Sequence, residues 1–392
     1  MGSSGPPGGG AWPKILLAKP AAHPSGGGAG ASGVPSGVVK LMRDEESAAR
    51  SRLYQGSLNL ITDAWEFSAD RLLPLMSDNT DFTVVGVLGL PGVGKSTILN
   101  ELYGFDSVAS GVLPPFPVQT EETRAQARHC STGMELRVSS ERLILLDTQP
   151  IYSSSVLMDL TLPDGSSSLQ LLSGESISGE LAYELMGLQL GVFLTAVCHV
   201  VLLVTDGKND TTLWKMLQTI EMLRQGIPDP STVGSGGQLS TSTEDIPQET
   251  NSEFFADTIF VHTKLRESDL DFNSIEKFKA ALSEYFKSSF RRNGLPQTEA
   301  TENTDNALRM ETTNVFVLPR AQDESSKKFK SSSLMLRQLR DQILSMPRRS
   351  FPKPLNERDW LRNASRVWDL VKKSPVISDY GKLLQNSGLF RR

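Results

Sequence analysis

Short apolar runs alternate along this chain with stretches whose apolar residues recur every three or four positions. Continuous apolar runs rich in β-branched residues are typical of strands buried in a parallel sheet. Six runs predict strands: Phe82–Leu88, Met134–Val138, Arg142–Leu146, Ala196–Thr205, Thr258–His262 and Val315–Leu318. Strands that alternate with helices predict a three-layer α/β domain with a mostly parallel sheet.

The three-to-four-residue periodicity predicts amphipathic helices between these strands. The predicted helices cover residues 95–103, 181–192, 213–223, 275–286, 336–346 and 360–371. One more helix is predicted ahead of the first strand, on the shared face of Leu60, Ile61, Ala64, Trp65, Ser68 and Leu72. Val38–Met42 resembles a strand, and residues 151–175 are predicted to be an inserted loop.

Composition divides the chain into three parts. Residues 1–37 are mostly Gly, Pro, Ala and Ser, and a disordered tail is predicted because they bury too little apolar surface to offset their chain entropy. The α/β domain is predicted to span residues 38–346, with a disordered low-complexity insertion at 226–252. Residues 347–392 are a predicted C-terminal helical extension, in which Trp360 and Trp368 would anchor against the domain or a partner.

The most specific pattern follows the first predicted strand directly. Residues 89–97 read Gly-Leu-Pro-Gly-Val-Gly-Lys-Ser-Thr, which is the full GxxxxGK(S/T) pattern. In such a loop, backbone N–H groups curl around phosphate oxygens, and the helix N-terminus adds its positive dipole end. A Gly-rich turn that merely precedes a helix is the alternative, and the strand before the loop disfavours it.

This pattern predicts a phosphate-binding loop with a defined set of residues. Lys95 would reach the β- and γ-phosphates of a nucleotide, while the Ser96 hydroxyl would bind Mg²⁺. The candidate nucleotide-binding residues are Gly89, Gly92, Val93, Gly94, Lys95, Ser96 and Thr97.

A candidate metal-binding carboxylate closes a later strand. The apolar run Leu143–Leu146 ends at Asp147, where P-loop proteins hold Mg²⁺ through a water molecule. An ordinary turn Asp after a buried strand is the alternative. The predicted Mg²⁺ site therefore consists of Ser96 and, through water, Asp147.

Composition and charge narrow the classes of function. A formal net charge of −5 over 392 residues argues against a general nucleic-acid binder. Two cysteines imply no disulfide framework, and the four histidines lack metal-ligand spacing. No uninterrupted apolar run approaches about 18 residues, so no membrane span is expected. The N-terminal residues lack a basic region followed by an apolar one, so no secretory signal is expected. We expect a soluble protein in the cytoplasm.

Two departures from the pattern of active GTPases affect what the site can do. Guanine specificity comes from Asn-Lys-x-Asp after a late strand, but the matching residues 263–266 are Thr-Lys-Leu-Arg, so guanine preference is not supported. Active GTPases also carry Asp-x-x-Gly followed by Gln, whereas Pro150 and Ile151 occupy these places. Pro150 has no N–H, and Ile151 cannot orient water. We expect binding of nucleotide without hydrolysis.

Four segments together resemble a known family. They are Val84-Val-Gly-Val-Leu-Gly-Leu-x-Gly-x-Gly-Lys-Ser, Leu146-Asp-Thr-Gln-Pro, Val197-Cys-His-Val and Arg366-x-Trp-Asp-x-Val-x-Lys-Ser374. Over roughly residues 38–386 the chain resembles the ninth SMG factors, G-domain-like subunits of the SMG kinase complex in nonsense-mediated mRNA decay.

The resemblance implies a fold, a ligand and partners. It implies a P-loop NTPase-like, G-domain-like fold that binds a purine nucleotide (ATP, ADP or GDP), with Mg²⁺ as a possible companion. It also implies a heterodimer with a sister G-like SMG factor, docked on a phosphatidylinositol-3-kinase-related kinase that the pair restrains. The rival hypothesis is an active P-loop NTPase with a non-guanine base preference. A phosphotransferase would need an Arg-rich lid, and residues 226–252 contain no Arg.

Overall fold

The computed structural model describes residues 58–105, 113–126, 128–162, 177–207, 210–233, 254–286, 315–320, 332–346 and 349–388. The predicted disordered tail 1–37, the strand predicted at Val38–Met42 and residues 234–252 of the predicted insertion lie outside these ranges. Leu53–Arg392 form one compact unit.

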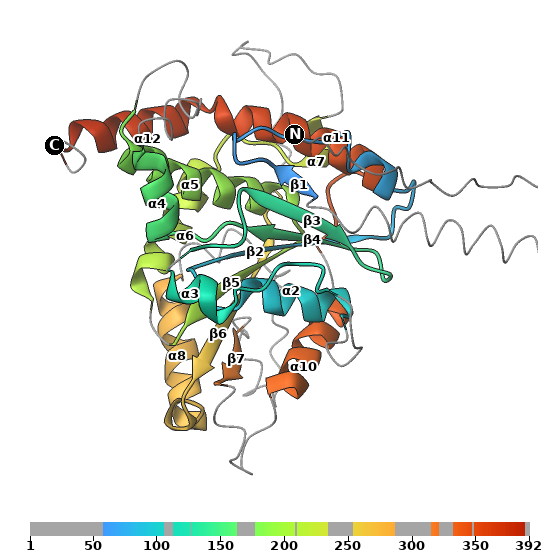
Figure 1. The fold of residues 1–392 in the computed structure, drawn as a ribbon. Coiled ribbons are helices and arrows are strands. Elements are labelled where there is room, and N and C mark those ends of the chain that lie inside the picture. The colour runs from blue at the N-terminus through green and yellow to red at the C-terminus, as the bar shows by residue number, and fades with distance from the viewer. Residues whose placement is uncertain are drawn as a thin grey trace, which may run out of the picture. The chain divides into compact units, whose positions relative to one another are not determined.

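A seven-stranded mixed sheet is the centre of this unit (Figure 1). Its order is β1-β3-β4-β2-β5-β6-β7. Neighbours from β4 to β7 run parallel, whereas β3 is antiparallel to both β1 and β4. The strands are β1 (Asn59–Ile61), β2 (Thr83–Gly89), β3 (Met134–Val138), β4 (Leu143–Thr148), β5 (Val200–Asp206), β6 (Asp257–Leu265) and β7 (Val315–Pro319). The predicted α/β class and mostly parallel sheet are confirmed.

The sheet separates two apolar cores because successive strand residues point to opposite faces. In β2, Val85 and Val87 belong to the core beneath α2 (Lys95–Tyr103) and α10 (Ser332–Ser345), whereas Val84 and Leu88 belong to the larger core. Helices α5 (Gly179–Val197), α6 (Thr211–Leu223), α8 (Phe272–Tyr285) and α11 (Glu357–Lys372) contribute to that larger core. The helices therefore lie on both faces, as the alternating pattern predicts (Figure 1).

Helix α5 is the central helix of the larger core. Fourteen of its 19 residues are buried, and it lies against α4 (Ser154–Thr161), α6, α11 and α12 (Pro375–Asn386). Within the described residues it is the one helix long and apolar enough to cross a membrane.

Three predicted local structures differ from the observed ones. The helix predicted over Leu60–Leu72 is wrong: residues 59–61 form β1, which pairs with β3, and a 3₁₀ turn follows at Leu73–Leu75. Tertiary pairing has overridden the helical spacing, although Leu60, Ile61, Trp65 and Leu72 are buried as expected.

The loop predicted at 151–175 contains α4 (Ser154–Thr161), and its residues from 163 onward lie outside the described ranges. The short helix α3 (Glu121–Ala125) lies ahead of β3. The first part of the predicted insertion includes α7 (Pro230–Val233), which lies against α11.

The C-terminal helix α11 is part of the domain's core. Trp360 and Trp368 have no exposed surface. The Trp360 indole donates to the Val197 carbonyl, and Trp368 packs edge-on against Trp65 and Phe193. Both tryptophans are therefore anchored within this chain.

Candidate functional site

The Gly89–Thr97 loop joins the end of β2 to the start of α2. Gly92 (φ 70°) and Gly94 (φ 98°) adopt the left-handed conformation that side chains disfavour. A Cβ at Gly89 would lie 2.2 Å from the Val204 carbonyl oxygen, so the loop can leave the sheet here only with glycine. Since β2 has β4 on one side and β5 on the other, the loop lies at a reversal of strand order, where α/β sheets bind ligands.

The Lys95 ammonium lies inside this loop. Its Nζ donates to the carbonyl oxygens of Gly89 (3.1 Å) and Leu90 (2.9 Å). Burial lowers the pKa of Lys95 to about 8, and the nearby Asp147 carboxylate opposes that change. An anion bound in the loop would therefore gain a cation that is already desolvated and held in place.

Asp147 and Ser96 meet at the carboxyl end of β4, as the sequence predicts. Asp147 Oδ2 accepts hydrogen bonds from Ser96 Oγ (2.7 Å) and Ser131 Oγ (3.0 Å). Oδ1 is buried and has no hydrogen-bond partner among the described residues. Burial raises the pKa of Asp147, while the Lys95 charge and the two hydroxyl hydrogen bonds lower it.

This arrangement fits a magnesium ion bound together with phosphate. The described residues contain no group of three or more His, Cys, Asp or Glu that could enclose a metal. Mg²⁺ at phosphate sites needs only one or two protein oxygens, because water and phosphate fill its other positions. Ser96 Oγ and Asp147, with its orphaned Oδ1, are oxygen donors of the required kind.

Ser131 is a site residue that sequence reasoning missed. It precedes β3, and β3 runs antiparallel to β4 with Met134 opposite Thr148. Glu135 lies opposite Asp147, so the residues just before β3 lie at the carboxyl end of β4, where the Ser131 hydroxyl reaches Asp147. Both strands were predicted from the sequence, but only their antiparallel pairing shows that Ser131 lies near Asp147.

Thr263 also ties the loop to the sheet. Its Oγ1 donates to the Val93 carbonyl (2.8 Å) from the end of β6. The next residue, Lys264, forms an exposed ion pair with Asp206 at 2.8 Å, and Leu265 is buried. Residues 263–266, which stand where active GTPases carry the guanine-binding tetrad, thus lie at the same sheet edge as the loop.

The turn after Asp147 is occupied by other contacts. Gln149 Oε1 accepts from the Gly133 N–H (3.0 Å), so this amide is directed to the start of β3. Ile151 is buried, and its N–H donates to the Gly89 carbonyl at 3.2 Å. The Gln149 carboxamide oxygen and the Ile151 N–H are thus both engaged within the chain.

Comparison with known proteins identifies the relatives of this chain. It is 29% identical over 382 residues to the nonsense-mediated mRNA decay factor SMG9 of Xenopus tropicalis, a match covering 91% of this chain and 72% of the relative. The SMG9 protein of Salmo salar is also 29% identical, over 387 residues and the same shares of both chains. Protein SMG9 of Drosophila melanogaster is 23% identical over 82% of this chain and 58% of its own length.

No protein-family model matches the chain. The resemblance predicted from the four sequence segments is confirmed: the chain is similar to the SMG9 factors along nine-tenths of its length.

Proposed function

We propose that this SMG9-like chain is a nucleotide-binding, non-catalytic regulatory subunit in nonsense-mediated mRNA decay. The decay role is supported by the names of relatives that match nine-tenths of the chain. The nucleotide-binding role is supported by one observation: Lys95, Ser96 and Asp147 converge where a GxxxxGKST loop enters a helix.

The ligand we propose is a purine nucleotide (ATP, ADP or GDP) with Mg²⁺. The β-phosphate would lie at the N-terminus of α2, where the first turn's N–H groups point outward. Lys95 would exchange its two carbonyl partners for phosphate oxygens, and Ser96 would bind the metal. The bound metal supplies charge neutralisation between phosphates, and Asp147 with Ser131 would hold its water shell. The fold then belongs with the P-loop, G-domain-like proteins.

The absence of turnover is proposed from the turn at Pro150 and Ile151. Hydrolysis needs a γ-phosphate held by donors and a water molecule held in line with it. The loop supplies phosphate contacts, whereas Gln149 is bonded to Gly133 and Ile151 is apolar and buried. The nucleotide would then act as a structural ligand that stabilises the fold by linkage.

The partners are proposed from the resemblance alone. They are a sister G-like SMG factor, forming a heterodimer, and the SMG phosphatidylinositol-3-kinase-related kinase, which the pair would restrain in the cytoplasm. Because Trp360 and Trp368 are buried inside this chain, they anchor α11 against the domain and give no argument for a partner. Contact with nucleic acid or membrane is not part of the proposal.

The test of nucleotide binding is a calorimetric titration of Lys95→Ala with ATP, ADP and GDP in Mg²⁺. A charge-assisted phosphate contact is worth about 1.5–3 kcal/mol, so affinity should fall at least about tenfold. Lys215→Ala, an exposed lysine on α6, is the matched control. Equal affinity of Lys95→Ala and Lys215→Ala would refute the phosphate-binding assignment.

Heterodimer formation is tested by co-expression with the sister factor and size-exclusion chromatography with light scattering. We expect a one-to-one complex that survives dilution to nanomolar concentration. Two separate monomer peaks at micromolar concentration would refute the pairing.

A further inference from the structure

One segment between α2 and β3 contacts the Lys95–Asp147 site at several separate points. This segment, the strap, comprises the described residues 116–126 and 128–131 and includes the short helix α3. Its contacts reach α2, the Gly89–Thr97 loop, the end of β4 and α4. A single stretch of chain therefore joins four elements that lie far apart in the sequence.

The first end of the strap is held on α2. Phe116 has no exposed surface and belongs to the core beneath α2, together with Val93 of the loop. The Asn100 carboxamide donates to the Phe116 carbonyl and accepts from the Phe116 N–H, both at 2.9 Å. Because one buried side chain bonds both backbone polar groups of Phe116, the strap starts from a fixed position.

The second end of the strap is held beside the proposed metal site. The Ser131 hydroxyl donates to Asp147 Oδ2 at 3.0 Å, at the end of β4. Two residues earlier, His129 Nδ1 lies 2.7 Å from Ser155 Oγ, in the first turn of α4. The strap therefore ends at the carboxylate that we assign to the water shell of Mg²⁺.

Gln119 brings the middle of the strap onto the loop. Its Nε2 donates to the Arg128 carbonyl at 2.8 Å, which joins the two sides of α3. A Cβ at Gly92 would lie 3.5 Å from Gln119 Oε1, which is van der Waals distance. Helix α3 itself is capped by Thr120, whose hydroxyl accepts from the Thr123 N–H. The Gln119 carboxamide therefore lies against the loop that would cradle the phosphates.

We propose that the strap retains the nucleotide by enclosing its phosphates against the Gly89–Thr97 loop. This inference rests on the proposed nucleotide binding and concerns how the ligand exchanges. The contacts that hold the strap join groups of the chain itself, so none of them needs a γ-phosphate oxygen. Segments that signal the nucleotide state are instead ordered by the γ-phosphate and its metal. The strap therefore closes over diphosphates and triphosphates alike.

Retention by a strap has its own kinetic signature. Since the strap closes through contacts within the chain, it must open both when the nucleotide enters and when it leaves. Loosening the strap then raises the association and dissociation rate constants by the same factor and leaves Kd unchanged. Loss of a residue that bonds the nucleotide directly raises the dissociation rate constant and Kd together. Loss of a purely structural residue lowers stability without this pattern.

Gln119→Ala loosens the middle of the strap and is the first test. Stopped-flow fluorescence with the N-methylanthraniloyl derivative of ADP and Mg²⁺ measures association, and a chase with unlabelled ADP measures dissociation. Because one hydrogen bond is lost, both rate constants should rise at least about threefold, while Kd changes by less than about twofold. Gln126→Ala, an exposed glutamine at the end of α3, is the matched control and should exchange nucleotide as the parent does.

Two further measurements test the other parts of the proposal. Ser155→Ala frees His129 from α4, so it should also raise both rate constants about threefold. The N-methylanthraniloyl derivative of adenylyl imidodiphosphate, a triphosphate analogue, should leave the parent at a rate within about threefold of the diphosphate. Hydrogen exchange shows whether each variant is folded, because the amides of the buried α5 should stay protected in all of them.

Several results would overturn the proposal. Unchanged rate constants in both Gln119→Ala and Ser155→Ala would show that the strap does not control exchange. A Kd that rises with the dissociation rate constant would make Gln119 a direct ligand contact instead. A triphosphate held more than about tenfold longer than the diphosphate would show that the γ-phosphate closes the strap. If the parent binds no nucleotide in calorimetry, the proposed function fails as well, whereas binding with rates insensitive to the strap variants refutes the strap alone.

Discussion

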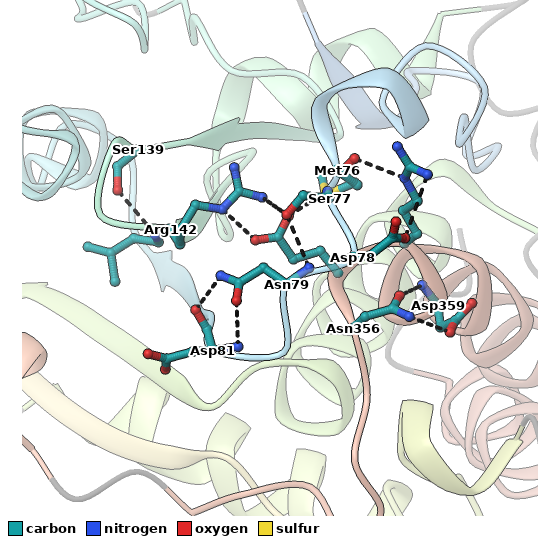
Figure 2. Close-up of polar contacts among 12 residues, drawn as sticks. Met76, Ser77, Asp78, Asn79, Asp81, Ser139, Arg142, Asn356 and Asp359 are labelled. Atoms are coloured by element: carbon teal, nitrogen blue, oxygen red, sulfur yellow. Dashed lines mark hydrogen bonds and ion pairs between the residues drawn. The ribbon is translucent and has the colours of Figure 1, made fainter. Parts of the chain in front are cut away.

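Arg142 and Glu357, far apart in the chain, form an ion pair in which Arg142 Nε donates to Glu357 Oε1 at 2.6 Å. Arg142 lies in the β3–β4 turn, and Glu357 lies in the first turn of α11. Ser77 completes the cluster, because its N–H (2.8 Å) and hydroxyl (3.0 Å) both donate to Glu357 Oε2 (Figure 2). Glu357 has no exposed surface, so these contacts replace all of its water.

The first prediction concerns this cluster. Glu357→Ala should lower the free energy of unfolding by about 2–3 kcal/mol, because it removes the acceptor of the Ser77 N–H and the carboxylate to which Arg142 Nε donates. The loss should fall below that of a fully buried pair, since Arg142 retains 28% of its side-chain exposure and can turn toward water. Urea denaturation of the parent and of Glu357→Ala measures this loss of unfolding free energy.

Asp369→Ala is the matched control on the same helix. Asp369 is exposed and pairs with Lys372, an arrangement worth less than about 1 kcal/mol. Equal destabilisation by the two alanine variants would mean that the Glu357 cluster does not secure α11.

The buried charge at Asp147 leads to a second prediction. Asp147→Asn keeps an acceptor for Ser96 and Ser131 but removes a desolvated charge, so the ligand-free protein should be at least as stable as the parent. The Mg²⁺-dependent part of nucleotide affinity should fall about tenfold, as expected for a lost charge-assisted contact. Calorimetric titrations with nucleotide in Mg²⁺ and in EDTA separate the Mg²⁺-dependent part of the affinity from the rest.

Asp341→Asn, on the exposed surface of α10, is the control for the Asp147 variant. If Mg²⁺ still strengthened nucleotide binding in Asp147→Asn as it does in Asp341→Asn, Asp147 would have no part in a metal site.

The strongly patterned elements of this fold could be predicted from the sequence. The β2–loop–α2 unit, the apolar face of α11 and the central strands follow from apolar periodicity and from the spacing of glycines around Lys95. Residues 59–61 could not be predicted, because their strand exists only through pairing with β3. Local spacing alone made this segment resemble a helix.

The candidate site divides in the same way. Lys95 and Ser96 belong to one short motif and Asp147 to another, so the sequence could place all three in one candidate site. In the structure the Ser96 hydroxyl donates to Asp147. Ser131 reaches Asp147 through antiparallel register, and Thr263 reaches Val93 through the parallel order of β2, β5 and β6. Such contacts between segments far apart in the chain have no local signature, so the sequence alone could not show them.

A third prediction concerns the dependence of stability on pH. His262 is buried in β6, and burial lowers its pKa to about 4, against a hydrogen bond with the Gly207 carbonyl that raises it. In the unfolded chain the imidazole titrates near its ordinary value of 6.5. Between these values the unfolded state binds more protons, so the free energy of unfolding falls as the pH decreases from 6.5 toward 4.

The slope of this loss approaches about 1.4 kcal/mol per pH unit for the single imidazole. His262→Asn removes the titration, so the difference in stability between parent and variant should shrink across this window and stay constant above it. Buried carboxylates with raised pKa values increase the free energy of unfolding as the pH falls. They contribute equally to parent and variant, so their effect cancels in the difference. A difference that does not change with pH would show that His262 is not held neutral.

The last prediction concerns catalysis by the proposed nucleotide site. Losing one preorganised donor typically costs about 10²–10³ in rate, and both Pro150 and Ile151 deprive the site of a donor. ATP and GTP turnover by the parent should therefore equal turnover by Lys95→Ala, with Mg²⁺ present. Because a partner can supply missing groups in trans, the assay is run on the assembled complex, with an inhibitor in the kinase active site.

His129 makes this assay informative in both directions. Burial lowers the pKa of His129, Asp159 opposes this change and the Lys95 charge adds to it, so a neutral imidazole lies near the loop, hydrogen-bonded to Ser155 Oγ at 2.7 Å. A neutral imidazole can accept a proton from water, which makes His129 the one group we would test as a base. Turnover near one per second that disappears in both Lys95→Ala and His129→Gln would establish an enzyme with a base supplied from the segment before β3. Equal, near-zero turnover in all three proteins is the result we expect, because Ser155 holds the imidazole and the apolar, buried Ile151 side chain cannot align water.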